Sequence, residues 1–509
     1  MKIQSHLNYH QKDFFILFTG LFLVLITSVR ADDPRTNSWL TTYSGKYARI
    51  YTSDVNKTNG AAVTVWTNSS GPNVTAQALP AYCGVQAVYA SSNWVYIRGS
   101  GLASVVMGPW YLNAGHTQAF PSYPTNQHVL YRIPRQPSVP GTKTASGGGP
   151  IGYFVDSVAM FNSWDAYYWN GTTNVQGGGS GNWNRDAYMN EGATFDPNNA
   201  HQAGGQHHYH ANPPGLRYLL GDHVDFNSTT KIYSESTNAP IKHSPILGWV
   251  ADGYPIYGPY GYSISNNASS GVRRMISGYV LRNGQSGTDN LTNTLRATSP
   301  AWSVRLYGSS SAGPSNLGFY PVGMYMEDNA YLADLTNSAT GQKYVMGTNT
   351  FDLDEYNGRW CVTPEFPSGT YAYFVAISSN GAPVFPYNIG RGYYGSPTGA
   401  STTTTVMSTN TPLTTCFKGS TNVQEIISAP AVNSANKNVT LTWSAVEGGT
   451  YQVNVSTNLL SSWTTNLALN RIATNIIASA TETNAAATNA VRFYRIARTS
   501  VAAFDSTGY

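Results

Sequence analysis

Histidines are concentrated in one short stretch of the chain. Six of the ten lie between residues 201 and 243, and these are His201, His207, His208, His210, His223 and His243. Neutral imidazole is the commonest metal ligand near pH 7, because it offers a lone pair without first losing a proton. The concentration therefore indicates a site for a divalent metal ion, and nitrogen ligands favour zinc or copper over calcium.

The centre of this stretch is GGQHHYHANPPG, residues 204–215. Its aromatic content and its flanking Gly and Pro residues predict an extended segment over 206–210, in which successive side chains alternate between two faces. His208 and His210 then project the same way with Cβ atoms roughly 6–7 Å apart, so both rings can bind one ion. The alternative is a pair of ordinary hydrogen-bonding histidines, but the nearby histidines and carboxylates favour a ligand pair.

Two ligands from one strand need partners from elsewhere in the chain. Asp196 and His201 lie just upstream of the pair, and His243 and Asp252 lie downstream. The Gly, Pro and Asn residues around them predict tight turns that can bring these side chains over the strand. We expect His243 and one of the other three to complete the ligand set.

Glu191 is the candidate general base, because it is a carboxylate close to the cluster that need not be a ligand. An open position on the ion could lower the pKa of a bound water and drive hydrolysis, or, with copper, support oxidation. A second hypothesis is a non-catalytic extracellular protein that binds carbohydrate or a surface partner and whose metal is structural.

The elements that must position these residues are predicted to be strands. Charged residues make up only 11% of the 509 residues and aromatic residues 13%, which excludes a coiled coil, a long helical bundle and a wholly disordered chain. Short apolar runs recur between turn signals, for example at 94–97, 151–155 and 371–375. Such runs suit a pleated surface, so we predict a mainly β fold with a large β-rich domain over 32–398.

Both ends of the chain differ from this domain. Residues 14–29 form an apolar run too short for the roughly 20 residues of a membrane span, so residues 1–31 are predicted to be a secretory signal peptide. The Thr-rich segment 399–424 is predicted to be an exposed linker. In 425–509, apolar residues alternate with polar ones around Trp443, which predicts a small β-sandwich.

Charge and cysteine content bound the partners. The formal charge of +4 on the whole chain gives no electrostatic case for nucleic acid. We expect a protein that is secreted, periplasmic or on the cell surface, with an extracellular polysaccharide or surface partner and no membrane association after cleavage. Cys83, Cys361 and Cys416 are too few for a disulfide framework. Two alternatives are left open: one disulfide between Cys83 and Cys361, or three unpaired thiols.

The segment GQHHYH, followed by DGYPIYGP at 252–259, resembles the YHYH domain family of secreted, mainly bacterial proteins. The chain departs from the family motif at its first position, where His207 replaces a tyrosine. The resemblance extends over about 100–395 and includes the stretches 149–167, 183–201, 243–262 and 351–374. It implies a metal-binding role and no settled reaction. Residues 425–498 resemble the fibronectin type III-like modules of secreted bacterial proteins, which implies adhesion or spacing.

One internal similarity concerns the histidine segment itself. GTYAYF (369–374) matches GQHHYH (205–210) in its Gly, in the Tyr at the fifth position and in its strand character. It is either a second copy that has lost the imidazoles or a chance similarity in a Tyr-rich chain.

Overall fold

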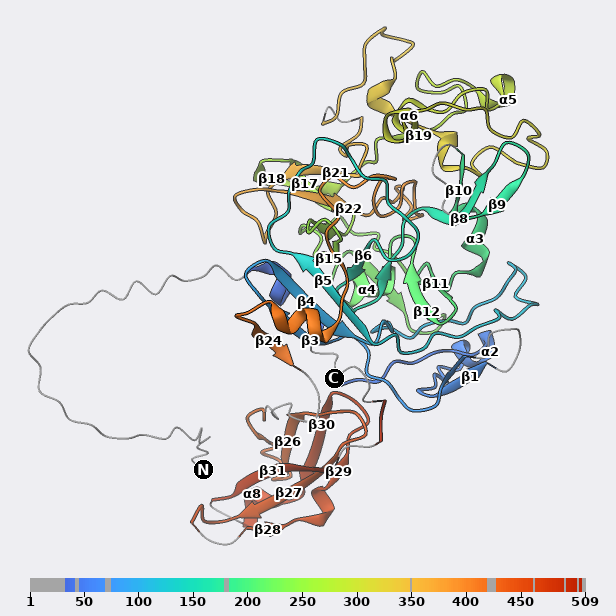
Figure 1. Cartoon of the computed structure of the whole chain (residues 1–509). Coiled ribbons are helices and arrows are strands. Elements are labelled where there is room, and N and C mark those ends of the chain that lie inside the picture. Colours follow the sequence, from blue (N-terminus) through green and yellow to red (C-terminus); the bar gives the residue numbers. More distant parts are fainter. Residues whose placement is uncertain are drawn as a thin grey trace, which may run out of the picture. The chain divides into compact units, whose positions relative to one another are not determined.

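The computed structural model describes residues 33–41, 45–68, 75–177, 183–347, 350–418, 427–460, 463–488, 491–500 and 503–505. The predicted signal peptide, 1–31, lies outside these ranges. The described residues divide into two compact units: those within Ser38–Lys418 and Phe504–Tyr509 form one, and those within Gly419–Ala503 and Met1–Asn37 form the other. Both consist mainly of strands joined by loops and short helices (Figure 1), which confirms the mainly β prediction. Among the described helices, none is long and apolar enough to cross a membrane.

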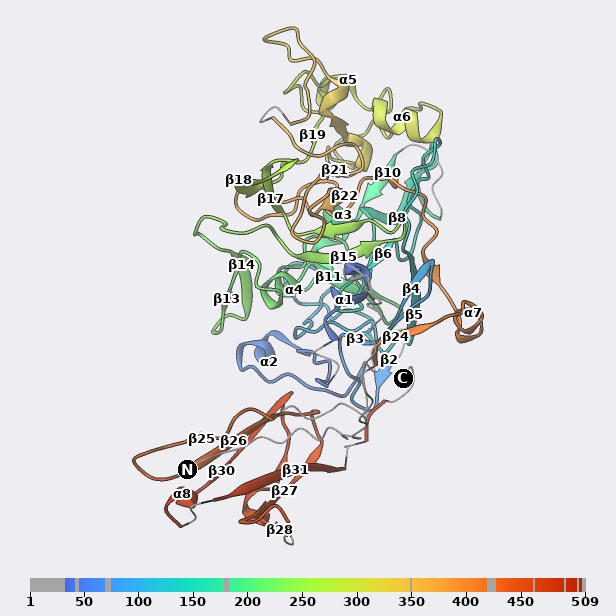
Figure 2. The ribbon, with the colours of Figure 1, turned by 90° about the vertical axis from the view of Figure 1, so that its left-hand side faces the viewer.

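The larger unit is built around an eight-stranded sheet. In spatial order its strands are β11 (Ala200–Ala203), β12 (Gln206–Tyr209), β7 (Ala159–Met160), β6 (Gly152–Phe154), β15 (Ile246–Val250), β16 (Pro255–Tyr257), β22 (Thr370–Phe374) and β21 (Gly358–Cys361). In Figure 1 the sheet runs from β21 and β22 above, through β15 and β6, to β11 and β12 below, and Figure 2 shows the same order from β21 and β22 to β11. Most of its β-branched and aromatic side chains are buried in one continuous core, as such residues pack well on a pleated surface.

Strand pairing in this sheet follows the same pattern from either edge. Going inward, the first pair is antiparallel, the second parallel and the third antiparallel, and the central pair β6–β15 is antiparallel. In the central pair Tyr153 lies opposite Trp249, and both belong to the pattern Gly-aromatic-x-x-Asp. The sheet therefore consists of two similar halves related by an approximate two-fold axis. The first half comprises β6, β7, β11 and β12, and the second comprises β15, β16, β21 and β22.

The outer strands of the two halves also correspond. Tyr209 of β12 lies beside Met160, and Tyr373 of β22 lies beside Ile256. Met160 and Ile256 each follow the Asp of the shared pattern by four residues, so Tyr209 and Tyr373 occupy equivalent positions. This register agrees with the interpretation of GTYAYF as a second copy of GQHHYH.

A five-stranded antiparallel sheet belongs to the same unit. Its strands, in spatial order, are β23 (Ala400–Ser401), β5 (Val129–Pro134), β4 (Trp94–Gly99), β3 (Val85–Ala90) and β24 (Thr414–Lys418). Residues 399–418, which are predicted to be an exposed linker, are indeed mostly exposed, but they supply both edge strands and helix α7 (Thr404–Thr409). Threonine is β-branched and polar, so a Thr-rich segment suits the edge of a sheet as well as a linker. Residues 419–426 lie outside the described ranges.

Smaller elements surround the two sheets. A three-stranded sheet contains β10 (Asn184–Asp186), β8 (Trp164–Trp169) and β9 (Asn174–Gln176). The two-stranded sheets are β1 (Trp66–Asn68) with β2 (Thr75–Gln77), β13 (Val224–Asn227) with β14 (Ile232–Glu235), β17 (Tyr260–Ile264) with β18 (Asn267–Arg274), and β19 (Tyr279–Leu281) with β20 (Asn329–Tyr331). The helices of these regions are α2 (Asp54–Thr58), α3 (Ala187–Glu191), α4 (Pro214–Leu219), α5 (Leu291–Thr294) and α6 (Ala301–Tyr307), and helix α1 (Pro34–Asn37) precedes this unit in the chain.

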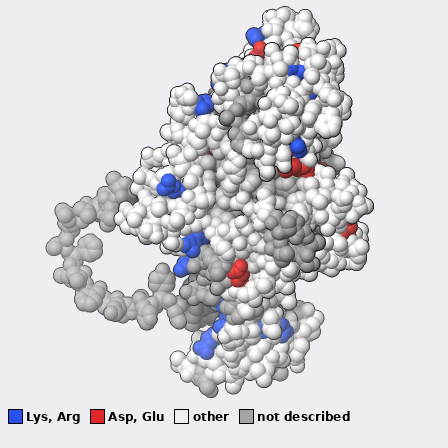
Figure 3. Space-filling view, turned by 45° about the vertical axis from the view of Figure 1, so that its right-hand side comes forward, with Lys and Arg blue, Asp and Glu red and all other residues white. Residues whose placement is uncertain are grey.

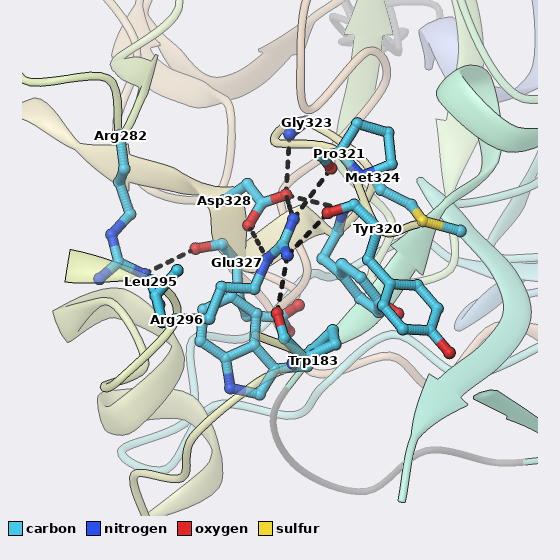
Figure 4. A network of polar contacts seen from close by, with 12 residues as sticks. Trp183, Arg282, Leu295, Arg296, Tyr320, Pro321, Gly323, Met324, Glu327 and Asp328 are labelled. Atoms are coloured by element: carbon cyan, nitrogen blue, oxygen red, sulfur yellow. Dashed lines mark hydrogen bonds and ion pairs between the residues drawn. The ribbon is translucent and has the colours of Figure 1, made fainter. Parts of the chain in front are cut away.

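A buried ion pair stabilises the long excursion between β18 and β21. Arg296 donates from Nε and Nη2 to the two carboxylate oxygens of Asp328, at 2.6 and 2.8 Å, and both side chains are fully buried. Its remaining N–H groups donate to the carbonyl oxygens of Pro314, Tyr320 and Pro321 (Figure 4). The ion pair and these hydrogen bonds offset the cost of removing the guanidinium from water.

The three cysteines, all in described ranges, form no disulfide with one another. Cys83 and Cys361 are buried and Cys416 is exposed. The Cys83 thiol donates to the carbonyl oxygen of Lys46 at 3.1 Å, and burial raises its pKa to about 12. Of the two alternatives left open above, the structure supports three separate thiols.

The smaller unit has two sheets that share one core. One contains β25 (Ala431–Val432), β26 (Val439–Ser444) and β30 (Ile477–Glu482); the other contains β28 (Thr464–Thr465), β27 (Thr450–Ser456), β29 (Arg471–Ile472) and β31 (Phe493–Ser500). Helix α8 (Ala485–Thr488) lies between β30 and β31 in the chain. The buried apolar residues of β26 and β27 follow the predicted alternation, with Trp443 in the core, although Asn454 and Ser456 of β27 are buried as well. The β-sandwich character is therefore seen, whereas the fibronectin type III-like assignment stays a prediction.

Charged side chains are sparse and scattered on the face shown in Figure 3. Among the atoms coloured there, Lys and Arg form no continuous basic surface.

Candidate metal centre

Strands β11 and β12 bring three imidazoles together. His201 lies directly opposite His208 in the antiparallel register, and His210 follows the end of β12. The three rings place one nitrogen each within 4.8 Å of one another, and Nε2 of His208 lies 3.1 Å from Nε2 of His210. All three are buried. As predicted, His208 and His210 project to the same side of an extended segment.

Backbone carbonyls fix two of these rings. Nδ1 of His208 donates to the Gln206 carbonyl at 2.9 Å, and Nδ1 of His210 donates to the Asn162 carbonyl at 2.8 Å. A carbonyl oxygen only accepts, so Nδ1 carries the hydrogen and Nε2 keeps its lone pair. Both Nε2 atoms are therefore available to a metal ion.

A hydroxyl fixes the third ring. Thr194 donates its one hydroxyl hydrogen to the Glu191 carbonyl at 2.6 Å, so its oxygen accepts from Nδ1 of His201 at 2.8 Å. This arrangement again leaves Nε2 of His201 with a free lone pair. The three histidines are thus held in the same tautomer by three separate partners.

Glu191 lies beside these nitrogens. Its Oε2 is 3.5 Å from Nε2 of His210 and 3.8 Å from Nε2 of His201. It stands at the end of α3, whose first turn is capped by Asp186, which accepts the Met189 N–H at 2.9 Å. Its side chain is 30% exposed, against 8% or less for His201 and His210, so the site opens to solvent on the Glu191 side.

Burial sets the protonation of the whole cluster. It lowers the pKa of His210 to about 4 and those of His201 and His208 well below their usual value, so all three are neutral at pH 7. Burial, reinforced by the charge of Asp165, raises the pKa of Glu191 to about 8 in the metal-free site. A cation among the nitrogens would lower that pKa again, because opposite charge favours the carboxylate.

Phenylalanine rings enclose the histidines. Phe161 stacks on His208 with ring centroids 3.8 Å apart, and Phe195 stacks on His210 at 5.5 Å. These contacts restrict the rings and exclude water from the nitrogens, which strengthens ion–ligand interactions.

The geometry fits a four-coordinate ion. With metal–ligand distances of about 2.0–2.1 Å, tetrahedral ligand atoms are roughly 3.3 Å apart. The separation of 3.1 Å between the His208 and His210 nitrogens, and those of 3.5 and 3.8 Å from the Glu191 carboxylate to His210 and His201, are close to this value. Three nitrogens and one oxygen suit zinc or copper.

Two predicted ligands lie outside this cluster because they serve turns. Asp196 accepts the N–H groups of Gly108 and Asn198, both at 2.8 Å, and so joins the loop before β11 to the segment between β4 and β5. Asp252 accepts the Tyr373 hydroxyl at 2.6 Å in the second half of the sheet. The prediction that Asp196 or Asp252 is a ligand is therefore wrong.

His243 is also absent from the cluster, so the expectation that it completes the ligand set is wrong. It precedes β15 in the second half, where Nδ1 donates to the Ser244 carbonyl at 2.7 Å. Its ring packs against Tyr257 and Phe374 at centroid distances of 5.0 and 5.8 Å.

The other two histidines of the stretch have different surroundings. His207 points away from the cluster, packs on Trp110 at 5.8 Å and makes no hydrogen bond to a described residue through either ring nitrogen. His223 is half-buried against Tyr260. Sequence reasoning also missed Asn162 and Thr194, since a backbone carbonyl carries no residue signature and one threonine in a Thr-rich chain carries little.

The sequence model described as YHYH protein matches residues 130–385, which is half of the chain. The chain belongs to the YHYH family. Within this member, the departure at the first motif position falls on His207, whose side chain is on the face opposite the cluster, so the arrangement of His208 and His210 is unaffected. Searches of curated proteins and of solved structures find no significant match.

Proposed function

We propose that this YHYH protein binds one zinc or copper ion through His201, His208 and His210, and that the fourth position, next to Glu191, is open to a water molecule. The observation that carries the proposal is the orientation of the three rings. Each Nδ1–H is committed to a different acceptor, and each Nε2 lone pair is left in the same buried space. A chance cluster of core histidines would have no reason to share this tautomer.

Glu191 connects the site to solvent. Such an ion supplies Lewis acidity to a molecule bound beside it. Glu191 is the only partly exposed member of the group, and its carboxylate is placed to accept a proton from a water molecule on the solvent side. We propose this as the hydrolytic use of the centre; oxidative use requires copper and remains the alternative.

Elemental analysis of the purified full chain tests metal binding. The wild-type protein should hold about one equivalent of zinc or copper, and His208→Ala or His210→Ala should lose it while the protein stays folded. His223→Ala is the matched control, since its ring lies outside the cluster, and it should keep the metal. A wild-type protein that takes up neither metal on equilibration, or equal loss in all three variants, would contradict the proposal.

Export and the role of the smaller unit are also proposals. The apolar run at 14–29, with small residues near Ala31, supports secretion and a mature chain that begins at Asp32. Sequencing the amino terminus of protein recovered outside the cytoplasm tests this directly. The smaller unit is proposed to be a fibronectin type III-like spacer or adhesion module, and catalysis is assigned to the larger unit alone.

A further inference from the structure

The second half of the sheet carries a pocket of about 630 Å³. It lies between the segment 241–245, the hairpin β17–β18 and the loop at 364–365. Figures 1 and 2 both show this hairpin beside β21 and β22. Ile241 at its rim is 94% exposed, so the pocket opens to solvent.

This pocket adjoins the face that corresponds to the metal centre. By the strand registers, the counterparts of His201, His208 and His210 are Arg359, Ala372 and Phe374, and Tyr257 is the counterpart of Phe161. The Tyr257–Phe374 ring distance is 5.7 Å, the same as that of Phe161–His210. The second half thus also has an aromatic pair at these positions, stacked rather than edge-to-face, and it lacks the three histidines of the first half.

The imidazole of His243 is a polar group beside this aromatic pair. It is 5% exposed, its Nδ1–H is committed to the Ser244 carbonyl, and its Nε2 has no hydrogen-bond partner among the described residues. Burial lowers its pKa to about 4, so at pH 7 this nitrogen is a lone-pair acceptor that lacks a donor. A buried acceptor without a donor is unfavourable, and a ligand that donates to it removes that cost.

The remaining lining restricts the ligand further. Glu365 accepts the Tyr257 hydroxyl at 2.9 Å and presents a carboxylate to the pocket, which repels anions. Lys242 at the rim repels cations. Tyr262 offers a half-buried aromatic ring beside His243, at a centroid distance of 5.0 Å. Two acceptors and one aromatic ring suit a neutral ligand with hydroxyl donors and a C–H face.

We propose that this pocket binds a neutral sugar residue of a polysaccharide. The sugar donates hydroxyl hydrogens to Nε2 of His243 and to the Glu365 carboxylate, and it packs its C–H face on Tyr262. The two halves of the sheet then have different ligands, a metal ion in the first and a saccharide in the second. This assignment does not depend on the metal centre.

Affinity electrophoresis of the full chain in gels containing xylan, galactomannan or mixed-linkage β-glucan tests the proposal, with alginate as an acidic polymer. At least one neutral polymer should retard the wild-type protein. His243→Phe, which keeps a ring and loses the acceptor, and Glu365→Gln should each weaken binding by about tenfold or more. Asp225→Asn, on exposed strand β13, is the control and should bind as wild type.

Several results would overturn the proposal. One is a wild-type protein that is retarded by none of the neutral polymers, or by alginate alone. Another is that both pocket variants bind as well as the wild-type protein. Glu365→Gln carries the test if His243→Phe does not fold, because Glu365 is only half-buried. A folded His208→Ala/His210→Ala variant should still bind the polymer, and loss of binding there would move the saccharide to the metal centre.

Discussion

Replacing Thr194 by valine should weaken metal binding without removing any ligand. The Thr194 hydroxyl accepts from Nδ1 of His201 and donates to the Glu191 carbonyl, so it links two members of the proposed centre. Valine has nearly the same shape but offers neither contact. The rings of His208 and His210 keep their own backbone acceptors in this variant.

The magnitude follows from the buried Nδ1–H of His201. When Nε2 holds the ion, the ring cannot turn, and in the variant its Nδ1–H is buried without an acceptor. An unsatisfied buried donor costs about 1–3 kcal/mol. Loss of such an outer partner of a ligand typically lowers metal affinity about 10–100-fold, which corresponds to about 1.4–2.7 kcal/mol. We therefore expect Thr194→Val to raise the Kd for zinc by about 10–100-fold.

Competition with a chromophoric chelator measures this change, and Thr194→Ser is the matched variant because it keeps the hydroxyl. The serine variant should bind zinc within about threefold of wild type, and both variants should keep the wild-type circular dichroism spectrum. Wild-type affinity in the valine variant would refute the assigned tautomer of His201. Equal weakening in both variants would attribute the effect to packing.

Three further predictions concern protons and buried charge. Burial raises the pKa of Glu191 to about 8 in the metal-free site, so zinc must displace one proton when it binds. The affinity for zinc should therefore rise about tenfold per pH unit from about pH 6 to 8, and chelator titrations of Glu191→Gln should show no such slope. Burial also raises the pKa of Asp252 to about 6, so the folded state holds its proton more tightly than the unfolded chain does. The stability from Asp252 is then full below about pH 4 and decreases by about 3 kcal/mol as pH rises through about 6, and urea titrations should show a flatter pH dependence in Asp252→Asn. Finally, Arg296→Met should lower the free energy of unfolding by about 3–5 kcal/mol, because Asp328 is then buried and has lost its charge partner. Arg305→Met, at a half-exposed ion pair, should lower it by less than about 1 kcal/mol. Equal shifts of the urea midpoint in the two variants would contradict this difference.

The local part of the candidate metal centre was predictable from the sequence. The spacing of His208 and His210 places both rings on one side of an extended segment, because side chains in a strand alternate. His201 is close enough in sequence to face them across a tight hairpin, and it appeared among the candidates. Glu191 was singled out as a carboxylate near the cluster, and the structure places it beside the nitrogens.

The remote part was not predictable in the same way. His243 and Asp252 were candidates because they follow the histidine stretch closely, yet the chain leaves the first half of the sheet before it reaches them. The signal was present in the repeated pattern around Asp156 and Asp252, which assigns these two residues to equivalent turns in different halves. In both turns the carboxylate accepts a backbone N–H two residues later, a role that needs no metal.

Composition did not predict the edge strands within 399–418. A Thr-rich, weakly apolar segment reads as a linker, but the edge of an antiparallel sheet needs only backbone pairing and tolerates polar side chains on both faces. The segment pairs with β5 and β3, and both of these strands are recognisable from their own apolar runs.

The antiparallel contact between β6 and β15 places two copies of one pattern side by side across an axis. If each half once folded as a separate chain, that contact was a strand pairing with an identical neighbour, and the ancestor was a homodimer with two identical centres. Fusion into one polypeptide would have made the copies independent, since a substitution no longer changed both at once. Each copy could then diverge alone, which fits the presence of Arg359, Ala372 and Phe374 in one half at the positions of His201, His208 and His210 in the other.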